Sequence, residues 1–417
     1  RLSGSGTRGF WYPDYKSVRF SSRIPMPRLL HIFSQYYFFG GEEVFFHMMT
    51  RALSSFAEVD EFVYSSREFL EEHSGAVSRV KNMLFHRAMN ERLLKQAAQG
   101  YDAWIIHNVF PAMSPCIYEQ AVRQSVPVIH YMHNYRQGCL NGLGFRNGRE
   151  CAACSSGNYL HGILRRCWHG RFLDSMAAAC ILEKTRRLGT WRNLSAYIAI
   201  SHRQRELLES NGVNSARVRV IPHFYESGRR VADPGDRPRR DVLFAGRLTE
   251  EKGVFRLLQA WERLKPERRS LIIMGEGPLY GKLKGYIDSR GLDSVKMTGF
   301  VNREDQEAFR SRCGITIVPS LWEEPFGLAV LESWEYGAPV LVTPAGGLPE
   351  LVSHGLDGWV AESSSLEGLA QMLCEALHVE DQWTVMGKKG KEKLNERFTV
   401  DVWKKRMRRL FVEMGIE

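Results

Sequence analysis

The chain has 417 residues, a formal net charge of +10 and a globular composition, with 44% hydrophobic and 25% charged residues. These values exclude wholesale disorder, and no apolar run approaches the roughly 20 residues of a membrane-spanning helix. The excess of 57 Lys and Arg over 47 Asp and Glu fits nucleic acid, phosphorylated small molecules or anionic lipid as partners, or no polyanion at all.

At roughly 150 residues a domain, the length predicts two to three domains. Residues 1–27 are expected to be an N-terminal extension or a tag remnant, because the chain begins at Arg1 and not at Met. The sequence does not open with a charged segment followed by an apolar one, as a secretory leader does. We therefore expect a cytoplasmic protein, at most peripheral at the inner face of the membrane.

Short apolar runs recur along the chain and predict buried parallel strands, because β-branched residues are frequent in them and polar residues do not alternate. Helical patterns lie between the runs; in residues 253–264, for example, the apolar side chains fall on one face. The alternation of strands and helices predicts an α/β fold with parallel sheets covered on both faces. The runs are 28–34, 102–108, 126–134, 196–201, 218–222, 241–246, 270–275, 295–299, 314–320 and 339–344.

Residues 226–240 are rich in Gly, Pro and Arg and predict a linker. They separate a first Rossmann-like, doubly wound domain at 28–225 from a second one at 241–397. Ligands of such sheets bind at the carboxyl ends of the strands, so we expect the cleft between the two domains to be the site. Residues 398–417 predict a final amphipathic helix with Val402, Met407, Leu410 and Phe411 on its apolar face.

Several phosphate-binding motifs are absent from the sequence. It has no P-loop, no Asp-x-Asp pair, and no G-x-G-x-x-G motif after a strand, since Gly275, Gly277 and Gly281 have the wrong spacing. These absences argue against a P-loop ATPase and a standard NAD enzyme. If the protein binds phosphate, we expect helix ends and fixed cations to hold it.

Two segments of the second domain meet that requirement. In 244–253 a predicted strand ends at Gly246, and Arg247 and Lys252 follow in a loop where two cations could neutralise a diphosphate. A solvated loop is the alternative. A third strand end, in 343–350, carries a glycine loop that permits close approach of a ligand.

In residues 324–332, Gly327 is expected to open a helix whose free N–H groups at Gly327 and Leu328 could hold phosphate. Glu332 could then bind paired hydroxyls, as on a ribose, and Glu324 the hydroxyls of a sugar. The alternative is that both acids only favour the helix N-terminus through its dipole.

Together these segments resemble the retaining glycosyltransferases of family 4, which have the two-domain GT-B fold. The resemblance rests on Glu324-x7-Glu332 around Pro-Phe-Gly-Leu, on Gly-Arg-Leu-Thr-x-Glu-Lys-Gly at 246–253, on Met-Gly-Glu-Gly-Pro at 274–278 and on Thr-Gly-Phe-Val at 298–301. It covers about nine tenths of the chain, and it implies that the last helix crosses back to the first domain.

The resemblance also implies residue roles. Arg247 and Lys252 would bind the donor diphosphate, Glu332 the ribose and Glu324 the transferred sugar. In the first domain, His133 matches the strand-end histidine beside the donor sugar, with His107 as the competing candidate. The other donor-binding residues that the motifs imply are Gly41 in a glycine loop, Gly275, Phe300 and Val301 beside the base, Phe326, Gly327 and Leu328.

The expected chemistry needs no metal or other cofactor. Fixed cations and helix N–H groups stabilise the charge that develops on the leaving diphosphate, and the transition state is oxocarbenium-like. No carboxylate of the first domain is evident as a nucleophile, so we favour attack on the same face, with the leaving phosphate assisting deprotonation of the acceptor. Retention itself is implied by the family.

Four cysteines form the pattern Cys-x11-Cys-x2-Cys-x12-Cys within an insertion at 135–170 that follows His133. The pattern predicts a structural zinc site, with free thiols, disulfides or an iron–sulfur site as alternatives. The four are Cys139, Cys151, Cys154 and Cys167, and the other four cysteines are expected to be core residues: Cys116, Cys180, Cys313 and Cys374.

The C-terminal segment 388–409 is strongly basic and fits either an anionic membrane surface or a solvated face of a helix packed on the first domain. The leading prediction is a glycosyltransferase that uses a UDP- or GDP-sugar and a glycan or lipid-linked acceptor in surface polysaccharide biosynthesis. A small soluble acceptor, or a non-catalytic nucleotide-sugar or glycan-binding protein, is the alternative. Nucleic acid is not expected, because no recognised motif supports it.

Overall fold

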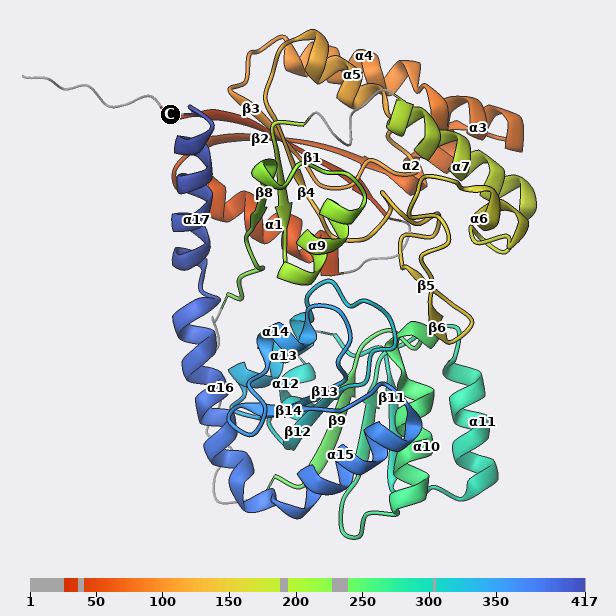
Figure 1. Ribbon diagram of the computed structural model, residues 1–417, viewed down its shortest axis with the longest axis vertical. Coiled ribbons are helices and arrows are strands. Elements are labelled where there is room, and N and C mark those ends of the chain that lie inside the picture. The colour runs from red at the N-terminus through yellow and green to blue at the C-terminus, as the bar shows by residue number, and fades with distance from the viewer. Residues whose placement is uncertain (1–25, 37–40, 188–193, 227–238, 303–304, 417) are drawn as a thin grey trace, which may run out of the picture.

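The computed structural model describes residues 26–36, 41–187, 194–226, 239–302 and 305–416. They form two α/β domains, one above the other in Figure 1, and each is built on a six-stranded parallel sheet with helices on both faces. This architecture confirms the predicted doubly wound, two-domain fold. The predicted extension lies almost wholly outside the described residues.

The sheet of the first domain has the order β2-β1-β3-β4-β7-β8. Its central strands are buried along their whole length, which is why they stand out as apolar runs. The strands are β1 (Arg28–Gln35), β2 (Glu58–Ser65), β3 (Ala103–Ile106), β4 (Val128–Tyr131), β7 (Ala196–Ala199) and β8 (Val218–Val220). The main covering helices are α1 (Gly41–Leu53), α2 (Ser66–Glu72), α3 (Ala76–Leu84), α4 (Arg87–Ala97), α5 (Cys116–Arg123), α7 (Phe172–Arg187) and α9 (His202–Ser210).

The sheet of the second domain has the order β11-β10-β9-β12-β13-β14. Its strands are β9 (Asp241–Ala245), β10 (Leu271–Met274), β11 (Val295–Gly299), β12 (Cys313–Val318), β13 (Val340–Val342) and β14 (Gly358–Val360). The helices are α10 (Val254–Leu264), α11 (Tyr280–Arg290), α12 (Gln306–Arg310), α13 (Leu328–Glu335), α14 (Leu348–Leu351) and α15 (Leu366–His378). Most of the predicted linker, residues 227–238, lies outside the described residues.

Two strands of the six-stranded sheets were not predicted, β2 and β14. Both are edge strands. β2 carries charged, partly exposed residues through its first half, so it lacks the apolar run of a buried strand. β14 has only three residues, too few for a periodic pattern.

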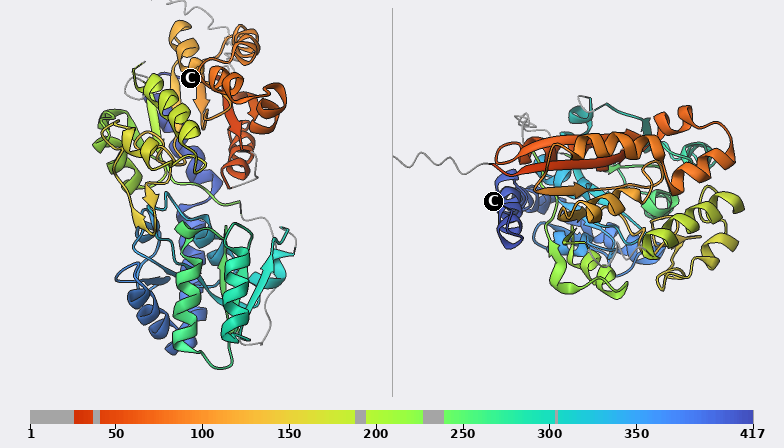
Figure 2. Two further views of the ribbon diagram at one scale, coloured as in Figure 1. Left: turned by 90° about the vertical axis from the view of Figure 1, so that its right-hand side faces the viewer. Right: turned by 90° about the horizontal axis from the view of Figure 1, so that it is seen from above.

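The C-terminal helices join the two domains. α16 (Trp383–Arg397) lies along the second domain, and α17 (Val400–Glu413) lies along the first (Figure 1). Trp403 is almost fully buried there, and its indole N–H lies 3.4 Å from the Tyr131 hydroxyl. Arg219 pairs with Glu413 at 2.8 Å. The predicted return of the last helix is confirmed, and the two further views agree, with the C-terminus at the first domain (Figure 2).

The position of α17 fits one of the two interpretations of the basic tail, the helix packed on the first domain. Trp403, Met407, Leu410 and Phe411 are buried against the first domain, so this apolar face packs on protein, as in the packed-helix interpretation. Within the described part of the chain, no helix has both the length and the apolar character needed to cross a membrane.

The cysteine-rich insertion forms a small subdomain of its own on the first domain. It carries the two-stranded hairpin of β5 (Phe145–Arg146) and β6 (Arg149–Glu150) and the short helix α6 (Leu160–Leu164). The hairpin reaches down to the second domain in Figure 1. A Cβ added to Gly148 at its tip would lie 3.6 Å from a carboxylate oxygen of Glu250.

Candidate functional site

The carboxyl ends of the two sheets face each other, and the predicted donor-binding residues of the two domains meet there. A Cβ added to Gly41, at the start of α1, would lie 3.7 Å from Leu328, the first residue of α13. The ring of Phe326 packs against His223 of the first domain at a centroid distance of 5.2 Å. Sequence segments almost 290 residues apart therefore form one site.

The centre of the site on the second domain is an ion pair between Lys252 and Glu324. The Lys252 ammonium donates to both carboxylate oxygens of Glu324, at 2.9 and 2.7 Å. The Ser320 hydroxyl and the Trp322 indole N–H donate to one of these oxygens at 2.8 and 2.9 Å. The two residues predicted for diphosphate and sugar are thus bound to each other, so a donor has to share or exchange these contacts.

The surroundings of Glu324 keep its side chain ionised. Burial by itself would raise the pKa of this carboxyl group, but the Lys252 ammonium and the two further hydrogen bonds lower it below the usual value. The loop of Gly346 packs directly on the same residue, since a Cβ there would lie 2.3 Å from the Glu324 carbonyl oxygen. Glu324 is therefore a fixed, almost fully buried carboxylate at the strand ends of the second domain.

Arg247 is the more accessible cation of the predicted pair. Its side chain is 64% exposed and lies 3.5 Å from Glu251, which also accepts the Thr249 hydroxyl at 2.6 Å. An exposed guanidinium at the end of β9 remains available to a diphosphate.

Glu42 is a carboxylate of the first domain that the sequence analysis missed. It lies at the start of α1, half-buried, and burial raises the pKa of its carboxyl group, against the lowering effect of the nearby Arg136, Asn134 and Arg247. One of its oxygens has no hydrogen-bond partner among the described residues. Glu42 is thus a carboxylate of the first domain that lies near a cation of the second, Arg247.

Glu332, the predicted ribose ligand, lies on α13 and is held by Arg310 at 2.6 Å. Arg310 is 6% exposed, and one of its terminal nitrogens is buried without a hydrogen-bond partner within the described chain. No motif marks Arg310, since it comes from α12, 22 residues away. The structure adds it as a residue that orients Glu332.

The predicted base-binding residues follow β11. Phe300 is 72% exposed, as suits a ring that stacks on a ligand, and Val301 is half-buried. Gly275, after β10, has a φ of 141°, and a Cβ there would lie 1.9 Å from the carbonyl oxygen of Gly246. Gly275 therefore allows two strand-end loops to touch, which is a structural role beside the donor-binding role predicted for it.

The N-terminus of α13 is as predicted. Gly327 has a φ of 108° and precedes the first helical residue, Leu328, and the helix ends at Glu335. Its first N–H groups lie at the junction of the domains, where they could bind phosphate.

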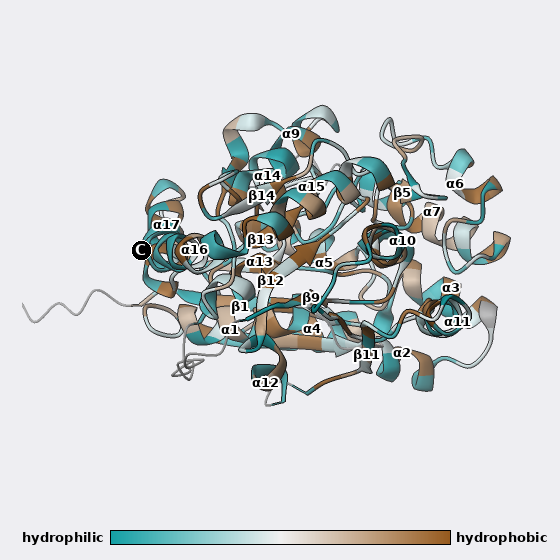
Figure 3. Cartoon of the chain, turned by 90° about the horizontal axis from the view of Figure 1, so that it is seen from below, coloured by the Kyte–Doolittle hydropathy of each residue, from teal (hydrophilic) through white to brown (hydrophobic). Residues whose placement is uncertain are grey.

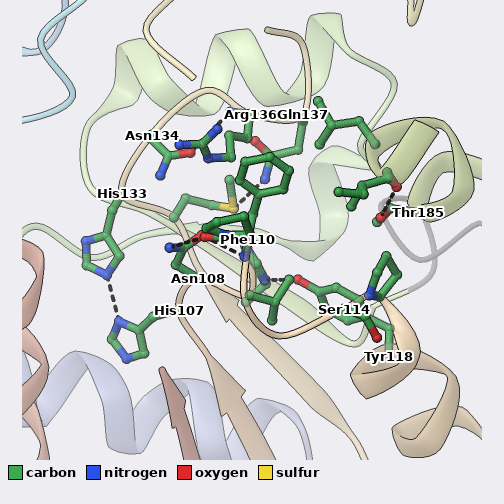
Figure 4. Close-up of a pocket in the computed structure, with 17 residues that line it drawn as sticks. His107, Asn108, Phe110, Ser114, Tyr118, His133, Asn134, Arg136, Gln137 and Thr185 are labelled. Atoms are coloured by element: carbon green, nitrogen blue, oxygen red, sulfur yellow. Dashed lines mark hydrogen bonds between the residues drawn. The ribbon is translucent and has the colours of Figure 1, made fainter. Parts of the chain in front are cut away.

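On the first domain, His133 lies just past the end of β4 and is 7% exposed. It is hydrogen-bonded to the competing candidate His107, with 2.6 Å between His107 Nδ1 and His133 Nε2, as Figure 4 shows. The two candidates therefore form one unit. A cavity beside them is lined by further polar side chains from the loop after β4: Asn134, Arg136 and Gln137.

Contacts outside the motifs hold the two domains together. The Arg203 guanidinium pairs with the Glu323 carboxylate at 2.6 Å, and Glu350 accepts the backbone N–H groups of His202 and Arg203 at 2.7 and 2.6 Å. The ring of Tyr135 packs edge-on to Trp322 at 6.3 Å. No sequence motif predicts these contacts, because each joins residues more than 100 positions apart.

The four insertion cysteines line one small cavity, and none of the eight cysteines forms a disulfide. Two of the other four were wrongly expected in the core. Cys180 is exposed and Cys374 half-buried, because they lie on the outward faces of α7 and α15.

Within the described residues, a set of side chains outside the insertion brings atoms that could bind a metal close together. Glu72, His73 and His86 bring one such atom each within 4.8 Å of one another. However, His86 Nδ1 accepts the backbone N–H of Met89 at 3.1 Å. The other ring nitrogen of neutral His86 then carries the proton and has no lone pair for a metal.

Two family models match the chain, one in each domain. The model of Glycosyltransferase Family 4 matches residues 39–229, and that of Glycosyl transferases group 1 matches residues 232–393. An uncharacterized glycosyltransferase of Methanocaldococcus jannaschii is 24% identical over 354 residues, which span 81% of this chain and 92% of that protein. The amylovoran biosynthesis glycosyltransferase AmsK of Erwinia amylovora is 30% identical over 169 residues, 39% of this chain and 41% of that protein.

Solved structures show the same architecture. The Anabaena protein HepE in complex with UDP and glucose has a TM-score of 0.66 and 16% identity, over 93% of this chain and 100% of that one. Sucrose-phosphate synthase of Thermosynechococcus elongatus has a TM-score of 0.69 and 18% identity, over 93% and 99% of the two chains. At these identities the likeness establishes the fold.

Proposed function

Because this chain is a glycosyltransferase of family 4 with the GT-B fold, we propose that it transfers a sugar from a UDP- or GDP-sugar to a glycan or lipid-linked acceptor, with retention of configuration. The observation that carries the donor assignment is the buried Lys252–Glu324 pair beside Arg247 and the N-terminus of α13. It combines cations for a diphosphate with a carboxylate for sugar hydroxyls at one point of the cleft.

Relatives support the donor and the pathway class. HepE was crystallised with UDP and with UDP-glucose. A glycosyltransferase of amylovoran biosynthesis and a putative one of colanic acid biosynthesis are among the relatives, each matching 39% of this chain. We therefore infer surface polysaccharide or glycolipid synthesis as the role.

In the proposed reaction the bond between the anomeric carbon and the diphosphate oxygen breaks, and its electron pair stays on the diphosphate. Arg247, Lys252 and the first N–H groups of α13 stabilise that charge without a metal. The acceptor hydroxyl forms the new bond on the same face, and its proton passes to the leaving phosphate. Glu42 is the alternative nucleophile, and a Glu42→Gln variant that still transfers sugar at a substantial rate argues for the same-face route.

A thermal-shift panel of nucleotide sugars tests the donor assignment, because a ligand that binds only the folded state raises the melting temperature. Glu324→Gln should abolish transfer while UDP or GDP still stabilises the protein. The exposed Glu362→Gln is the matched control and should retain transfer. No shift with any uridine, guanosine or adenosine diphosphate sugar refutes the assignment.

The same experiment separates the proposal from its alternatives. A non-catalytic binding protein shows the thermal shift but no turnover with any acceptor extract. An enzyme for small soluble acceptors turns over without membrane lipid, whereas a lipid-linked acceptor requires the lipid fraction.

We propose that the protein meets the cytoplasmic face of the membrane through α6 of the insertion and the adjoining start of α7, rather than through α17. Five large apolar side chains on α6 and the start of α7 are exposed, next to basic residues, and Figure 3 shows hydrophobic segments of these helices at the edge of the molecule. The apolar residues are Leu160, Leu164, Phe172, Leu173 and Met176, and the basic ones Arg165, Arg166 and Arg171.

Vesicle flotation tests this surface. The wild-type protein should float with vesicles that contain anionic lipid, and the double change Leu164→Ser and Phe172→Ser should abolish flotation. Val385→Ser, at a comparably exposed position on α16, is the control. Equal flotation of both variants contradicts the proposal.

We also propose that Cys139, Cys151, Cys154 and Cys167 hold a structural zinc ion. All four line one cavity. Two groups already approach the sulfurs as second-sphere donors would: the Gly144 N–H lies 3.3 Å from Cys139 Sγ, and Arg165 lies 3.9 Å from Cys151 Sγ. The four side chains have to close around the ion, since their sulfurs do not form a ligand cluster within 4.8 Å.

Metal analysis of protein purified without chelator tests the site, with about one zinc equivalent expected. Cys154→Ser should lose the metal, and Cys180→Ser, at an exposed cysteine on α7, should keep it. Less than about 0.1 equivalent of zinc refutes the zinc site, and stoichiometric iron in its place supports the iron–sulfur alternative.

A further inference from the structure

Three buried histidines of the first domain form a continuous hydrogen-bonded chain that starts at Thr50 on α1. His31 Nδ1 lies 2.9 Å from the Thr50 hydroxyl oxygen. His31 Nε2 lies 2.5 Å from His107 Nε2, and His107 Nδ1 lies 2.6 Å from His133 Nε2. The chain comes from β1 and from the ends of β3 and β4, and it ends at His133, where the sheet faces the second domain.

Burial keeps all three rings neutral. It lowers the pKa of His31 and of His133 to about 3, and it holds the pKa of His107 well below its usual value, with the neighbouring histidines adding to the effect. A neutral imidazole has one N–H and one bare nitrogen. The three rings can therefore carry their protons in only two consistent arrangements, one the reverse of the other.

Thr50 selects between the two arrangements. Its hydroxyl proton is directed to the Phe46 carbonyl oxygen, 3.2 Å away in the preceding turn of α1, so the Thr50 oxygen accepts from His31 Nδ1–H. His31 Nε2 is then bare and accepts from His107 Nε2–H. His107 Nδ1 is bare in turn and accepts from His133 Nε2–H.

The chain therefore leaves His133 Nδ1 with a lone pair, and this atom is buried with no hydrogen-bond partner anywhere in the described residues. A buried polar atom without a partner is rare and indicates a ligand or a water molecule. Around it the ring of His133 stacks on His223 at 5.4 Å, and His223 packs on Phe326 beside the donor helix. The lone pair thus lies on the side of the first domain that faces the predicted donor-binding residues of the second.

We propose that Thr50 is a positioning residue that fixes the tautomer of His133 through His31 and His107, so that His133 Nδ1 accepts a hydrogen bond from a hydroxyl of the donor sugar. The inference rests on the proposed function for the identity of the ligand. In the reverse arrangement His133 Nδ1 would carry a proton. A sugar hydroxyl oxygen would then have to accept the hydrogen bond from Nδ1–H, with its own hydrogen pointing away.

The tautomer is measured directly by NMR of protein labelled with 15N in histidine, which distinguishes bare ring nitrogens from protonated ones. In the wild-type protein we expect a proton on Nε2 of His133 and none on Nδ1, with the signals assigned through a His133→Gln variant. A protonated Nδ1 in the wild-type protein overturns the proposal, whatever the outcome of activity assays.

The matched pair Thr50→Val and Thr50→Ser tests the role of the hydroxyl group. Valine has the shape of threonine but cannot accept from His31, so the His133 signals should shift towards the other tautomer. The kcat/KM for the nucleotide sugar should fall about tenfold, as for the loss of one hydrogen bond. The affinity for the nucleoside diphosphate alone should not change. Thr50→Ser keeps the hydroxyl group and should restore both the spectrum and the rate.

The possible failures are distinguishable. If Thr50→Val leaves both the His133 spectrum and kcat/KM unchanged, the relay is wrong. If Thr50→Val weakens nucleoside diphosphate binding as much as sugar transfer, its effect is general disruption and the positioning role is wrong. If the wild-type protein turns over no nucleotide sugar, the proposed function fails while the tautomer measurement still stands.

Discussion

Replacing Lys252 with Met removes the positive charge that keeps the buried Glu324 ionised. Loss of one partner of a fully buried ion pair costs about 3–5 kcal/mol. The Lys252 side chain is 21% exposed, and Ser320 and Trp322 still donate to the carboxylate. We therefore expect the lower end of that range, about 3 kcal/mol of the free energy of unfolding at neutral pH.

The loss of stability in Lys252→Met should depend on pH, because the change removes the charge that lowers the pKa of the buried Glu324. In the wild-type protein the folded-state pKa is lowered, so this group stabilises the fold above its unfolded pKa, and the stabilisation is lost as the pH falls through the folded pKa. In Lys252→Met, burial instead raises the folded-state pKa of Glu324. The stabilisation from this group is then complete below its unfolded pKa and is lost as the pH rises. The difference in free energy of unfolding between the variant and the wild-type protein should therefore shrink from pH 7 towards about pH 5.

Urea denaturation at both pH values measures this effect without any substrate. Lys284→Met, at an exposed position on α11, is the control and should change stability by less than about 0.5 kcal/mol. The double variant Lys252→Met with Glu324→Gln should recover most of the loss, because a neutral amide needs no counter-ion. If Lys252→Met loses the same stability at both pH values, and if adding Glu324→Gln does not restore it, then Lys252 does not act by keeping Glu324 ionised.

Three further substitutions test separate parts of the structure. Gly275→Ala should cost at least about 3 kcal/mol in urea denaturation, because φ is positive at Gly275 and an added Cβ would lie 1.9 Å from a backbone oxygen. Gly285→Ala, with open space around it on α11, is the control and should instead stabilise the protein by about 0.5–1 kcal/mol. Trp403→Ala should cost about 3–5 kcal/mol, because the indole is buried between α17 and the first domain, whereas Val412→Ala, 66% exposed on the same helix, should have little effect. Arg310→Met should weaken UDP or GDP binding about tenfold in calorimetry, equal to about 1.4 kcal/mol. The reason is that Glu332, the predicted ribose-binding residue, loses its only ion-pair partner among the described residues. Unchanged affinity contradicts the orienting role of Arg310.

Local features of the sequence determined the two-sheet architecture. Buried parallel strands such as β3, β4 and β12 are apolar throughout, so they are visible without any knowledge of their neighbours. The start of α13 was equally visible, since only glycine readily adopts the φ of 108° found at Gly327. The edge strand β2 was missed because its exposed, charged residues break the apolar pattern.

The tertiary structure decided which of the motif residues act together and what holds them. Lys252 and Glu324 carry opposite charges that any sequence shows, but their direct contact depends on how two strand-end loops pack. The same holds for Arg310 on Glu332 and for the chain from Thr50 through His31 and His107 to His133, whose members come from one helix and from three strands or their ends and have no common motif. Short-range patterns determine which segments are buried, whereas hydrogen bonds and ion pairs between distant segments depend on side-chain positions that only the folded chain brings within 3 Å of one another.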